Sequence, residues 1–310
     1  HECSSAASDV YKRQVVTMPP PSSGGAVLLQ VLAVLEGYEL PTYGHGSADL
    51  YHLYAEAFQH AFADRARYMG DPDRIDVPTE AMLDPERIAE IRRQILPGRT
   101  FDREYYGTAI DIGRDAGTLH ISVLDDDGMA VALTTTINTS FGSRVVGTRS
   151  GVLLNNEMDD FVARPGVPNA YGLVGSEANA VAPGARPLSS MTPTVLISPE
   201  GDRRIVVGAS GGPFIISSTL QVIVDIIDFD LDPSEAVSAP RMHHQWAPEK
   251  LFIDADVSPD TERALIGRGH TVQRFPFFSS VQVVVSEGEG SERAVYGAAD
   301  PRKGGYAVSY

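Results

Sequence analysis

The 310-residue sequence has little of three things: cysteine, basic charge and long apolar runs. Its single cysteine, Cys3, can form neither an internal disulfide nor a thiolate metal cluster. The 25 Lys and Arg residues are outnumbered by 41 Asp and Glu residues. This balance disfavours a nucleic-acid or anionic-membrane surface, because both are held mainly by basic side chains. No run approaches the roughly 18 apolar residues of a membrane span. A globular protein remains, consistent with 43% hydrophobic residues.

The start of the sequence differs in character from the rest. Residues 1–14, HECSSAASDVYKRQ, are mostly small or polar and show neither a strand nor a helix period. We interpret them as a non-native or disordered leader. The chain lacks an initiating Met and a visible signal peptide, so we expect that an authentic upstream region is missing.

Helical patterns precede position 118 and strand patterns follow it. Ser47 can cap a helix whose apolar residues recur at i, i+3 and i+4 spacing. The segments DDDG and PEGD each separate two apolar runs and predict hairpins. The expected helices are 26–36, one from Ser47 to about 68, 84–95, 214–229, a short one in DPSEAVS, and 258–268. The expected strands are 120–124, 130–136, 194–198, 204–207, 272–275, 280–285 and 294–296. This order predicts an α+β fold with helices packed on antiparallel sheets.

The pair Gly117-Thr118 stands at the start of the first hairpin strand. A threonine hydroxyl is a weak nucleophile, but at a chain terminus its own α-amine, which titrates near 8, can act as the base. Such a device requires cleavage of the bond before Thr118. Glycine at position 117 suits it, because a residue without a Cβ tolerates a strained scissile backbone. The alternative is an ordinary strand start.

Other polar segments could serve such a nucleophile. In TTTIN, Thr136 and Asn138 are two residues apart and are expected on one face of the second hairpin strand. The segment NNEMDDF offers carboxylates that could bind an ammonium group, or that could simply form a solvated loop. The candidate carboxylates are Glu157, Asp159 and Asp160.

Two further segments offer donors to an anion. PLSSM places the adjacent hydroxyls of Ser189 and Ser190 after a proline, although such a segment is usually only a turn. GASGG, residues 208–212, follows an apolar strand and precedes a helix. Its backbone amides could bind an oxyanion or a carboxylate.

These motifs, in their collinear order, resemble the γ-glutamyltransferase (glutathione hydrolase) family of N-terminal-nucleophile hydrolases. The resemblance covers nearly everything from about Val15 to the C-terminus. The matching segments are TMPPPSSGG, DRARYMGDPD, GTLHISVLD, TTTINTSFGS, SGVLLNNEMDDF, RPLSSMTPTV, VVGASGG, PRMHHQW and DPRKGG.

The resemblance implies a proenzyme that cleaves itself between Gly117 and Thr118 into a heterodimer. Residues 15–117 would be the C-terminal, mostly helical part of the large subunit, and residues 118–310 the small subunit. Thr118 would attack the γ-glutamyl carbonyl of glutathione or a related donor, and Thr136 would position it.

The resemblance also implies how the reaction is completed and how the donor is bound. Water would complete hydrolysis, or an amino-acid or peptide amine would complete transpeptidation, without a metal or an organic cofactor. The residues that match substrate-binding positions are Asn138, Glu157 and Asp160 toward the α-amino side, and Ser189 and Ser190 toward the α-carboxylate. The residues that match the oxyanion hole are Gly211 and Gly212.

The sequence departs from the family pattern in length. Several hundred residues precede the threonine in the family, whereas 117 do here. The arginine that clamps the donor carboxylate has no match in residues 15–117. The implied fold is therefore a four-layer αββα sandwich that is incomplete on its N-terminal side. The resemblance suggests a periplasmic or secreted protein, but the sequence itself leaves localisation open.

Three alternatives remain open. Cephalosporin (glutaryl) acylases share the architecture. A truncated, uncleaved and inactive scaffold would carry the same motifs. GASGG also fits the nucleophile elbow of a serine hydrolase, with Ser210 as nucleophile. Acids and histidines follow it in a suitable chain order: Asp225 or Asp228, then His243, His244 or His270.

Overall fold

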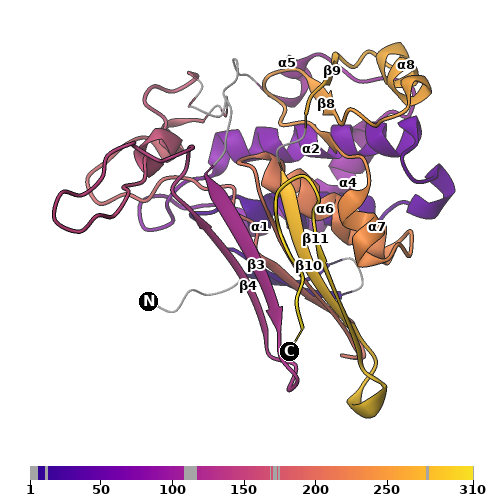
Figure 1. Ribbon diagram of the computed structural model, residues 1–310. Coiled ribbons are helices and arrows are strands. Elements are labelled where there is room, and N and C mark those ends of the chain that lie inside the picture. Colours follow the sequence, from indigo (N-terminus) through magenta and orange to yellow (C-terminus); the bar gives the residue numbers. More distant parts are fainter. Residues whose placement is uncertain are drawn as a thin grey trace.

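The computed structural model describes residues 6–10, 13–107, 117–167, 169, 173, 175–276 and 279–309. Residues 108–116, which precede the Gly117-Thr118 bond, lie outside the described part, as do residues 1–5 and 11–12 of the predicted leader. Figure 1 shows helices gathered on one side of the molecule and long antiparallel strands extending away from them.

Six of the eight described α-helices agree with the predicted ones to within a few residues, and two short helices, Thr79–Met82 and Arg103–Tyr106, were not predicted. Ser47 caps α2 as predicted, since its side chain accepts a hydrogen bond from the Leu50 amide. The α-helices are α1 (Gly24–Leu35), α2 (Ala48–Tyr68), α3 (Thr79–Met82), α4 (Pro85–Gln94), α5 (Arg103–Tyr106), α6 (Phe214–Ile227), α7 (Pro233–Ser238) and α8 (Pro259–Gly267). The 3₁₀ helices are η1 (Leu40–Tyr43), η2 (Glu157–Asp160), η3 (Glu177–Asn179) and η4 (Gly290–Glu292).

The strands form three sheets among the described residues. The six-stranded sheet has the order β1-β2-β5-β6-β10-β11, the ribbon is β3-β4, and the third sheet is β7-β8-β9. The strands are β1 (Ala6–Val10), β2 (Arg13–Thr17), β3 (Thr118–Leu124), β4 (Ala130–Thr136), β5 (Thr194–Ile197), β6 (Arg203–Ser210), β7 (Met242–His243), β8 (Leu251–Ile253), β9 (Val272–Arg274), β10 (Ser280–Glu287) and β11 (Ala294–Ala299). Every pair in the six-stranded sheet and in the ribbon is antiparallel, which confirms the predicted hairpins.

The first fourteen residues are not without regular structure. Ala6–Val10 forms β1, which pairs with β2 in the register Ala6↔Thr17 to Val10↔Arg13. The disordered alternative of the prediction is therefore wrong for these five residues, and the non-native alternative stays a prediction. The sequence of β1, AASDV, does not alternate apolar and polar residues, so no strand pattern was present there.

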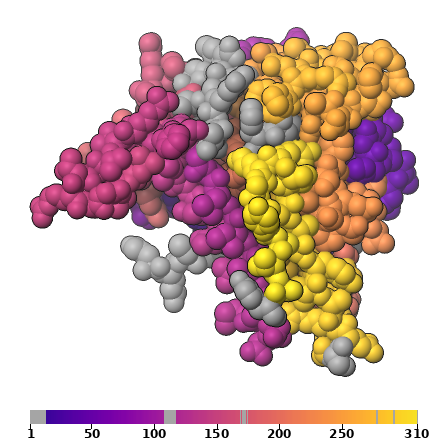
Figure 2. Space-filling model, viewed as in Figure 1, coloured from indigo at the N-terminus to yellow at the C-terminus, as the bar shows by residue number. Residues whose placement is uncertain are grey.

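The layers place the ribbon on one face of the six-stranded sheet and helices on the other. β3 packs against β6 and β10, while α6 packs against β6 and α1 packs against α6. In Figure 2 the ribbon, in magenta, lies beside the yellow C-terminal strands on the same face of the molecule. Helices, sheet and ribbon thus form successive layers, and the predicted α+β class is confirmed.

The core lies between the helices and the sheet. α1 is apolar on nearly all sides and buried over almost its whole length, as expected for a helix enclosed by other elements. It packs with α2, α6 and the sheet in one hydrophobic cluster that includes Leu28, Phe58, Val207 and Ile216. Among the described residues no helix combines the length and apolarity that crossing a membrane requires.

The boundary at 117/118 does not divide the chain into two separate folding units. β2 precedes this boundary, and it pairs directly with β5, which follows it. The two segments therefore share one sheet and one core. Their assignment to two subunits stays a prediction.

Candidate active site

The candidate nucleophile lies where β3 begins. Thr118 is directly opposite Thr136 in the antiparallel register, and their hydroxyl oxygens are 3.0 Å apart in a hydrogen bond. Both side chains point to the inner face of the ribbon, toward the six-stranded sheet, because residues alternate between faces along a strand. The pair is half-buried, so the hydroxyls are positioned but still reachable.

The structure gives a reason for glycine at position 117 besides the one inferred from the sequence. A Cβ at this position would lie 2.4 Å from the Asn138 carbonyl oxygen and 2.5 Å from that of Thr139. Close backbone packing therefore accounts for glycine before Thr118.

Asn138 lies beyond β4, and the prediction that it shares a strand face with Thr136 is wrong. β4 ends at Thr136, and Asn138 has a φ of 73°, a left-handed conformation that asparagine tolerates better than most residues. This turn lets the Asn138 amide donate to the Thr136 hydroxyl oxygen at 2.8 Å. The buried side chain donates to the Asn156 carbonyl at 3.0 Å. The turn therefore fixes Thr136 from one side.

A small pocket joins most of the residues singled out from the sequence. Its volume is about 30 Å³, room for about one water molecule. Of the predicted site residues, the lining includes Thr118, Thr136, Asn138, Glu157, Asp160, Ser189, Ser190 and Gly212. Gly211 is the neighbour of a lining residue but does not itself line the pocket. Tertiary structure thus brings together segments that are far apart in the sequence.

The carboxylates come from η2, a single 3₁₀ turn. Glu157 and Asp160 are at its two ends and are half-buried, whereas Asp159 between them is exposed. Asn179, which the sequence did not single out, donates from its side chain to the Asp160 carbonyl at 2.8 Å. The Asn179 side-chain oxygen accepts from the Leu188 amide at 3.0 Å. Asn179 therefore ties the carboxylate turn to the segment that carries the two serines.

The serine segment is held by the loop before α1. Ser189 exchanges backbone hydrogen bonds with Pro21 and Ser23, and the Ser23 hydroxyl donates to the Ser189 carbonyl at 2.7 Å. Ser22 adds a 2.7 Å bond from its hydroxyl to the Met191 carbonyl. The PSSGG motif, which carried no role in the sequence, thus supports the segment that forms one wall of the pocket.

A buried arginine lies close to both the carboxylate turn and the serine segment. Arg65, on α2, donates through Nε to the Ser23 hydroxyl at 2.8 Å. Burial lowers the pKa of Arg65 to about 10, and the negative charge of Asp160 opposes this shift. The guanidinium remains charged near neutrality, so it adds positive charge close to both Asp160 and the serine loop. The sequence offered a signal for it, since Arg65 belongs to the DRARYMGDPD motif.

The glycine pair lies between β6 and α6, as predicted. Gly211 and Gly212 have φ values of 131° and 58°, a region that favours glycine. A Cβ at Gly211 would also lie 2.8 Å from the Ser279 Cα. The pair turns the chain from the sheet into the helix beside Thr118, so that the Gly212 backbone borders the pocket.

His120 shares the inner face with Thr118 but is not arranged as its base. Its Nδ1 bonds the Thr134 hydroxyl at 2.7 Å and its Nε2 bonds the Ser122 hydroxyl at 3.1 Å. Burial lowers the pKa of His120 to about 4, so the ring is neutral at pH 7. Its role is to pack the ribbon onto the sheet.

The Ser210 alternative finds no support in the geometry. The Ser210 hydroxyl accepts from the Lys303 ammonium at 2.8 Å, and β6 lies between antiparallel neighbours rather than in a parallel βαβ unit. The nearby acids and histidines are engaged elsewhere. Asp225 bonds His45, His243 bonds Ser217 and Gln245, His244 accepts from Trp246, and His270 bonds His52.

A larger cavity lies elsewhere. Its volume is about 960 Å³, and Asp64, Arg87 and Tyr106 contribute to its walls. No predicted site residue lines it, so volume alone does not identify the site. The small pocket is the better candidate because it gathers hydroxyls, carboxylates and a glycine turn around one threonine.

Comparison with known proteins identifies the family of the chain. The family model for gamma-glutamyltranspeptidase matches residues 3–310. The glutathione hydrolase proenzyme of Escherichia coli (strain K12) is 44% identical over 306 residues, which are 97% of this chain and 51% of that protein. The chain thus spans about half the length of the curated relatives it matches.

Solved structures agree as well. A T380A mutant of the Helicobacter pylori gamma-glutamyltranspeptidase is similar with a TM-score of 0.58 and 44% identity, covering 61% of this chain and all of that one. The cephalosporin acylase of Bacillus halodurans has a TM-score of 0.78 at 24% identity, covering 99% of this chain and 53% of that one. The latter likeness shows the fold alone. On these matches, the chain belongs to the gamma-glutamyltranspeptidase family.

Proposed function

We propose that this chain carries the catalytic half of a γ-glutamyl hydrolase or transpeptidase, with Thr118 as the nucleophile. The observation that carries the proposal is the 3.0 Å contact between the Thr118 and Thr136 hydroxyls in a pocket that also holds paired carboxylates and paired serines. Family membership agrees with it, and the E. coli relative is named a proenzyme.

The active form requires cleavage between Gly117 and Thr118. The Thr118 hydroxyl attacks the Gly117 carbonyl, the bond to the Thr118 nitrogen breaks, and water hydrolyses the resulting ester. Cleavage frees an α-amine with a pKa near 8, a base on the same residue as the hydroxyl. The products, residues up to 117 and residues 118–310, remain together because β2 and β5 pair across the boundary.

The donor would be held at its amino-acid end. Glu157 and Asp160 accept hydrogen bonds from the α-ammonium, with Asn138 beside them, and the Ser189 and Ser190 hydroxyls donate to the α-carboxylate. The carboxylates and the serine hydroxyls that these opposite demands require all line the same pocket. The enclosed volume of about 30 Å³ is smaller than a γ-glutamyl group, so much of the donor lies outside the enclosed part.

Acyl transfer would follow in two steps. The α-amine takes the proton from the Thr118 hydroxyl as its oxygen bonds to the γ-carbonyl carbon, and the amine leaving group departs with a proton. Backbone amides at Gly211 and Gly212 stabilise the oxyanion, a contribution typically of about 3–4 kcal/mol for one donor. Water or an amino-acid or peptide amine then releases the γ-glutamyl group.

Two anilides test this proposal and separate it from the acylase alternative. γ-Glutamyl-p-nitroanilide and glutaryl-p-nitroanilide differ only in the α-amino group, which the Glu157 and Asp160 wall recognises. We expect the purified chain to release p-nitroaniline faster from the first. Preference for the glutaryl compound would favour the acylase, and no release from either would favour the inactive scaffold.

Two variants test the nucleophile. Thr118→Ala should abolish turnover and leave a single band on a denaturing gel, whereas the wild type gives two bands. Ser210→Ala is the matched control, since it removes a hydroxyl that the serine-elbow alternative needs. Turnover that survives Thr118→Ala and is lost with Ser210→Ala would overturn the assignment.

A further inference from the structure

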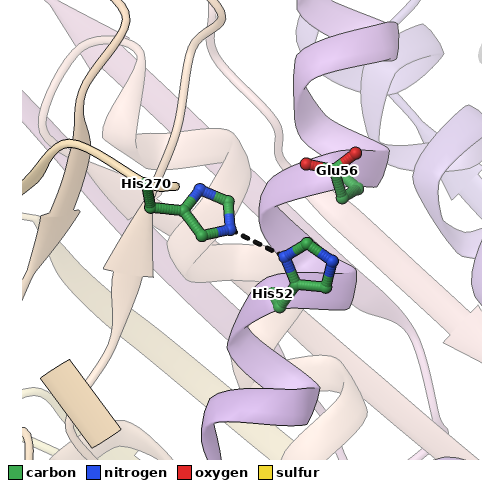
Figure 3. Close-up of side chains that lie close together, drawn as sticks. All are labelled: His52, Glu56 and His270. Carbon is green, nitrogen blue, oxygen red and sulfur yellow. Dashed lines mark hydrogen bonds between the residues drawn. The ribbon is translucent and has the colours of Figure 1, made fainter. Parts of the chain in front are cut away.

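A second polar cluster lies in the core, away from the Thr118 pocket. His52 and Glu56 are one turn apart on α2, and His270 approaches them from the segment that leads into β9. Figure 3 shows the two imidazole rings facing each other, with Glu56 further along the same helix. The three residues are 2%, 0% and 5% exposed. Such a buried set needs an explanation, because polar groups are costly to bury without partners.

The tautomer of His52 is fixed by its surroundings. Its Nε2 lies 2.8 Å from the Leu96 carbonyl oxygen, which can only accept, so the ring carries its hydrogen on Nε2. Its Nδ1 therefore presents a lone pair, and this atom faces Nε2 of His270 at 2.7 Å. A ring nitrogen oriented by a backbone carbonyl on the opposite nitrogen is the usual arrangement of a metal-binding histidine.

Glu56 is held in the same way. Its carboxylate accepts from the Gln59 side chain at 3.0 Å and from the Tyr106 hydroxyl at 2.6 Å. Burial raises the pKa of Glu56 to about 7. Each carboxylate oxygen has a second lone pair, so these bonds orient the group without using up its capacity as an acceptor.

We propose that His52, Glu56 and His270 form a buried zinc site. One ligand atom from each residue can be chosen so that all three lie within 4.8 Å of one another. Two histidines and one glutamate are the protein ligands of zinc in some hydrolases, where a water molecule takes the fourth position. The site joins α2 to a segment more than 200 residues away and takes no part in the chemistry at Thr118.

Zinc binding requires a local adjustment of all three side chains, since the Glu56 oxygen, now within 4.8 Å of the two nitrogens, must also reach the ion. Two nitrogens on one tetrahedral zinc ion are about 3.4 Å apart, so the rings must separate by about 0.7 Å from their 2.7 Å contact. The hydrogen that His270 donates through Nε2 moves to its Nδ1, and Glu56 binds as the carboxylate. The positive charge nearest the site, Arg268, is paired with Asp49, which reduces its repulsion of the ion.

Direct zinc binding tests the site without relying on activity. The purified wild-type chain, stripped with a chelator and titrated with zinc against a chromophoric competitor, should bind one equivalent. Cobalt in place of zinc should give the visible absorption of a tetrahedral ion with nitrogen and oxygen ligands. Absence of stoichiometric zinc binding, or an octahedral cobalt spectrum, would overturn the proposal.

Three variants locate the ion. His52→Gln and His270→Gln should each weaken zinc binding by at least about 100-fold, since loss of even an outer-shell partner costs 10- to 100-fold. His60→Gln is the matched control, because His60 is a buried histidine of the same helix outside the cluster. Unchanged affinity in the first two variants, or equal loss in all three, would place the ion elsewhere. Wild-type stoichiometry and the cobalt spectrum decide the matter if a variant fails to fold.

Discussion

Most half-exposed sheets bury their apolar face and expose their polar face. In the β3-β4 ribbon the polar face is buried and the apolar face is exposed. The inner face carries Thr118, His120 and Ser122, which are half-buried or buried against the six-stranded sheet. The outer face carries large apolar side chains that are 45–50% exposed: Leu119, Ile121, Val123, Val131 and Leu133. The alternation of side chains along the strands thus defines two faces, but the more apolar face is not the one that is buried.

Packing explains why the polar face is the inner one. The His120 ring occupies the space beside Gly208, where even a Cβ would lie 2.3–2.8 Å from three of its atoms. The Ser122 hydroxyl donates to the Gln282 carbonyl of β10 at 3.1 Å. Polar side chains that find partners can be buried at little net cost, and here they also deliver Thr118 to the pocket. The packing of His120 and Ser122 against the sheet, and the placing of Thr118 in the pocket, therefore explain why this face is the inner one.

The largest expected difference between the faces is in activity. Thr118→Ala removes the inner-face hydroxyl that we propose as nucleophile, and turnover of a γ-glutamyl anilide should fall at least about 10³-fold. Thr135→Ala removes a hydroxyl from the outer face of the same ribbon and should change turnover less than about 2-fold. Initial rates of p-nitroaniline release measure both. Similar losses in the two variants would remove the distinction between the faces.

Thr136→Val should have the next largest effect. The variant keeps the size of the side chain but loses the hydrogen bond to Thr118 and the acceptor of the Asn138 amide. The turnover number should fall about 10- to 100-fold, because a lost bond to a buried partner typically costs about 1–3 kcal/mol. The Michaelis constant should change much less. A change confined to that constant would instead assign Thr136 to donor binding.

Gly208→Ala tests the fit between the inner face and the sheet. The added methyl group collides with the buried His120 ring, so the free energy of unfolding should fall by about 1–3 kcal/mol, as in other overpacked cores. Urea denaturation measures the change. Full stability in this variant would show that the ribbon does not pack against β6 in solution.

The pH dependence of stability should also depend on the inner face. Burial lowers the pKa of His120 from 6.5 to about 4, so the unfolded chain binds this proton first as the pH falls. The contribution of neutral His120 is complete above about pH 6.5 and is lost progressively as the pH drops toward 4, with a slope of up to about 1.4 kcal/mol per pH unit. Urea midpoints of wild type and His120→Asn across this range isolate it from the other histidines. Parallel curves would contradict the buried, neutral state.

The smallest effect is expected on the outer face. Ile121 is 47% exposed, so Ile121→Thr should change the free energy of unfolding by no more than about 0.5 kcal/mol, as at other surface positions. Val207→Thr on β6, a fully buried position, is the comparison and should cost several times more. A large loss in the Ile121 variant would mean that the outer face is covered in solution.

Local patterns were sufficient for most elements. Ser47 predicted the start of α2 and DDDG predicted the turn of the ribbon, because capping and tight turns depend on a few adjacent residues. The strand β1 was not predicted, since its sequence, AASDV, does not alternate apolar and polar residues. The sequence pattern predicted that Asn138 lies on β4, but β4 ends two residues earlier. A residue in the left-handed conformation turns the chain, and the pattern of the neighbouring residues does not show this.

The site was predictable only as separate motifs. The resemblance to a family singled out Thr118, Glu157 and Ser189, and the structure lines one pocket with all three. Arg65 and Asn179 were missed as supports, because their hydrogen bonds to Ser23 and Asp160 join positions distant in the sequence. Spacing along the chain does not encode such contacts.

The sequence by itself determined most of the helices and strands, the family and the candidate nucleophile. The elements follow from residues close together in the chain, and the family follows from motifs in collinear order along nearly its whole length. Only the tertiary structure decided which face of the ribbon is buried, why residue 117 is glycine, and which side chains support the pocket. It also brought His270 to His52 and Glu56. Each of these depends on packing between segments far apart in the chain, where shape and hydrogen-bond geometry select among arrangements that local patterns leave equal.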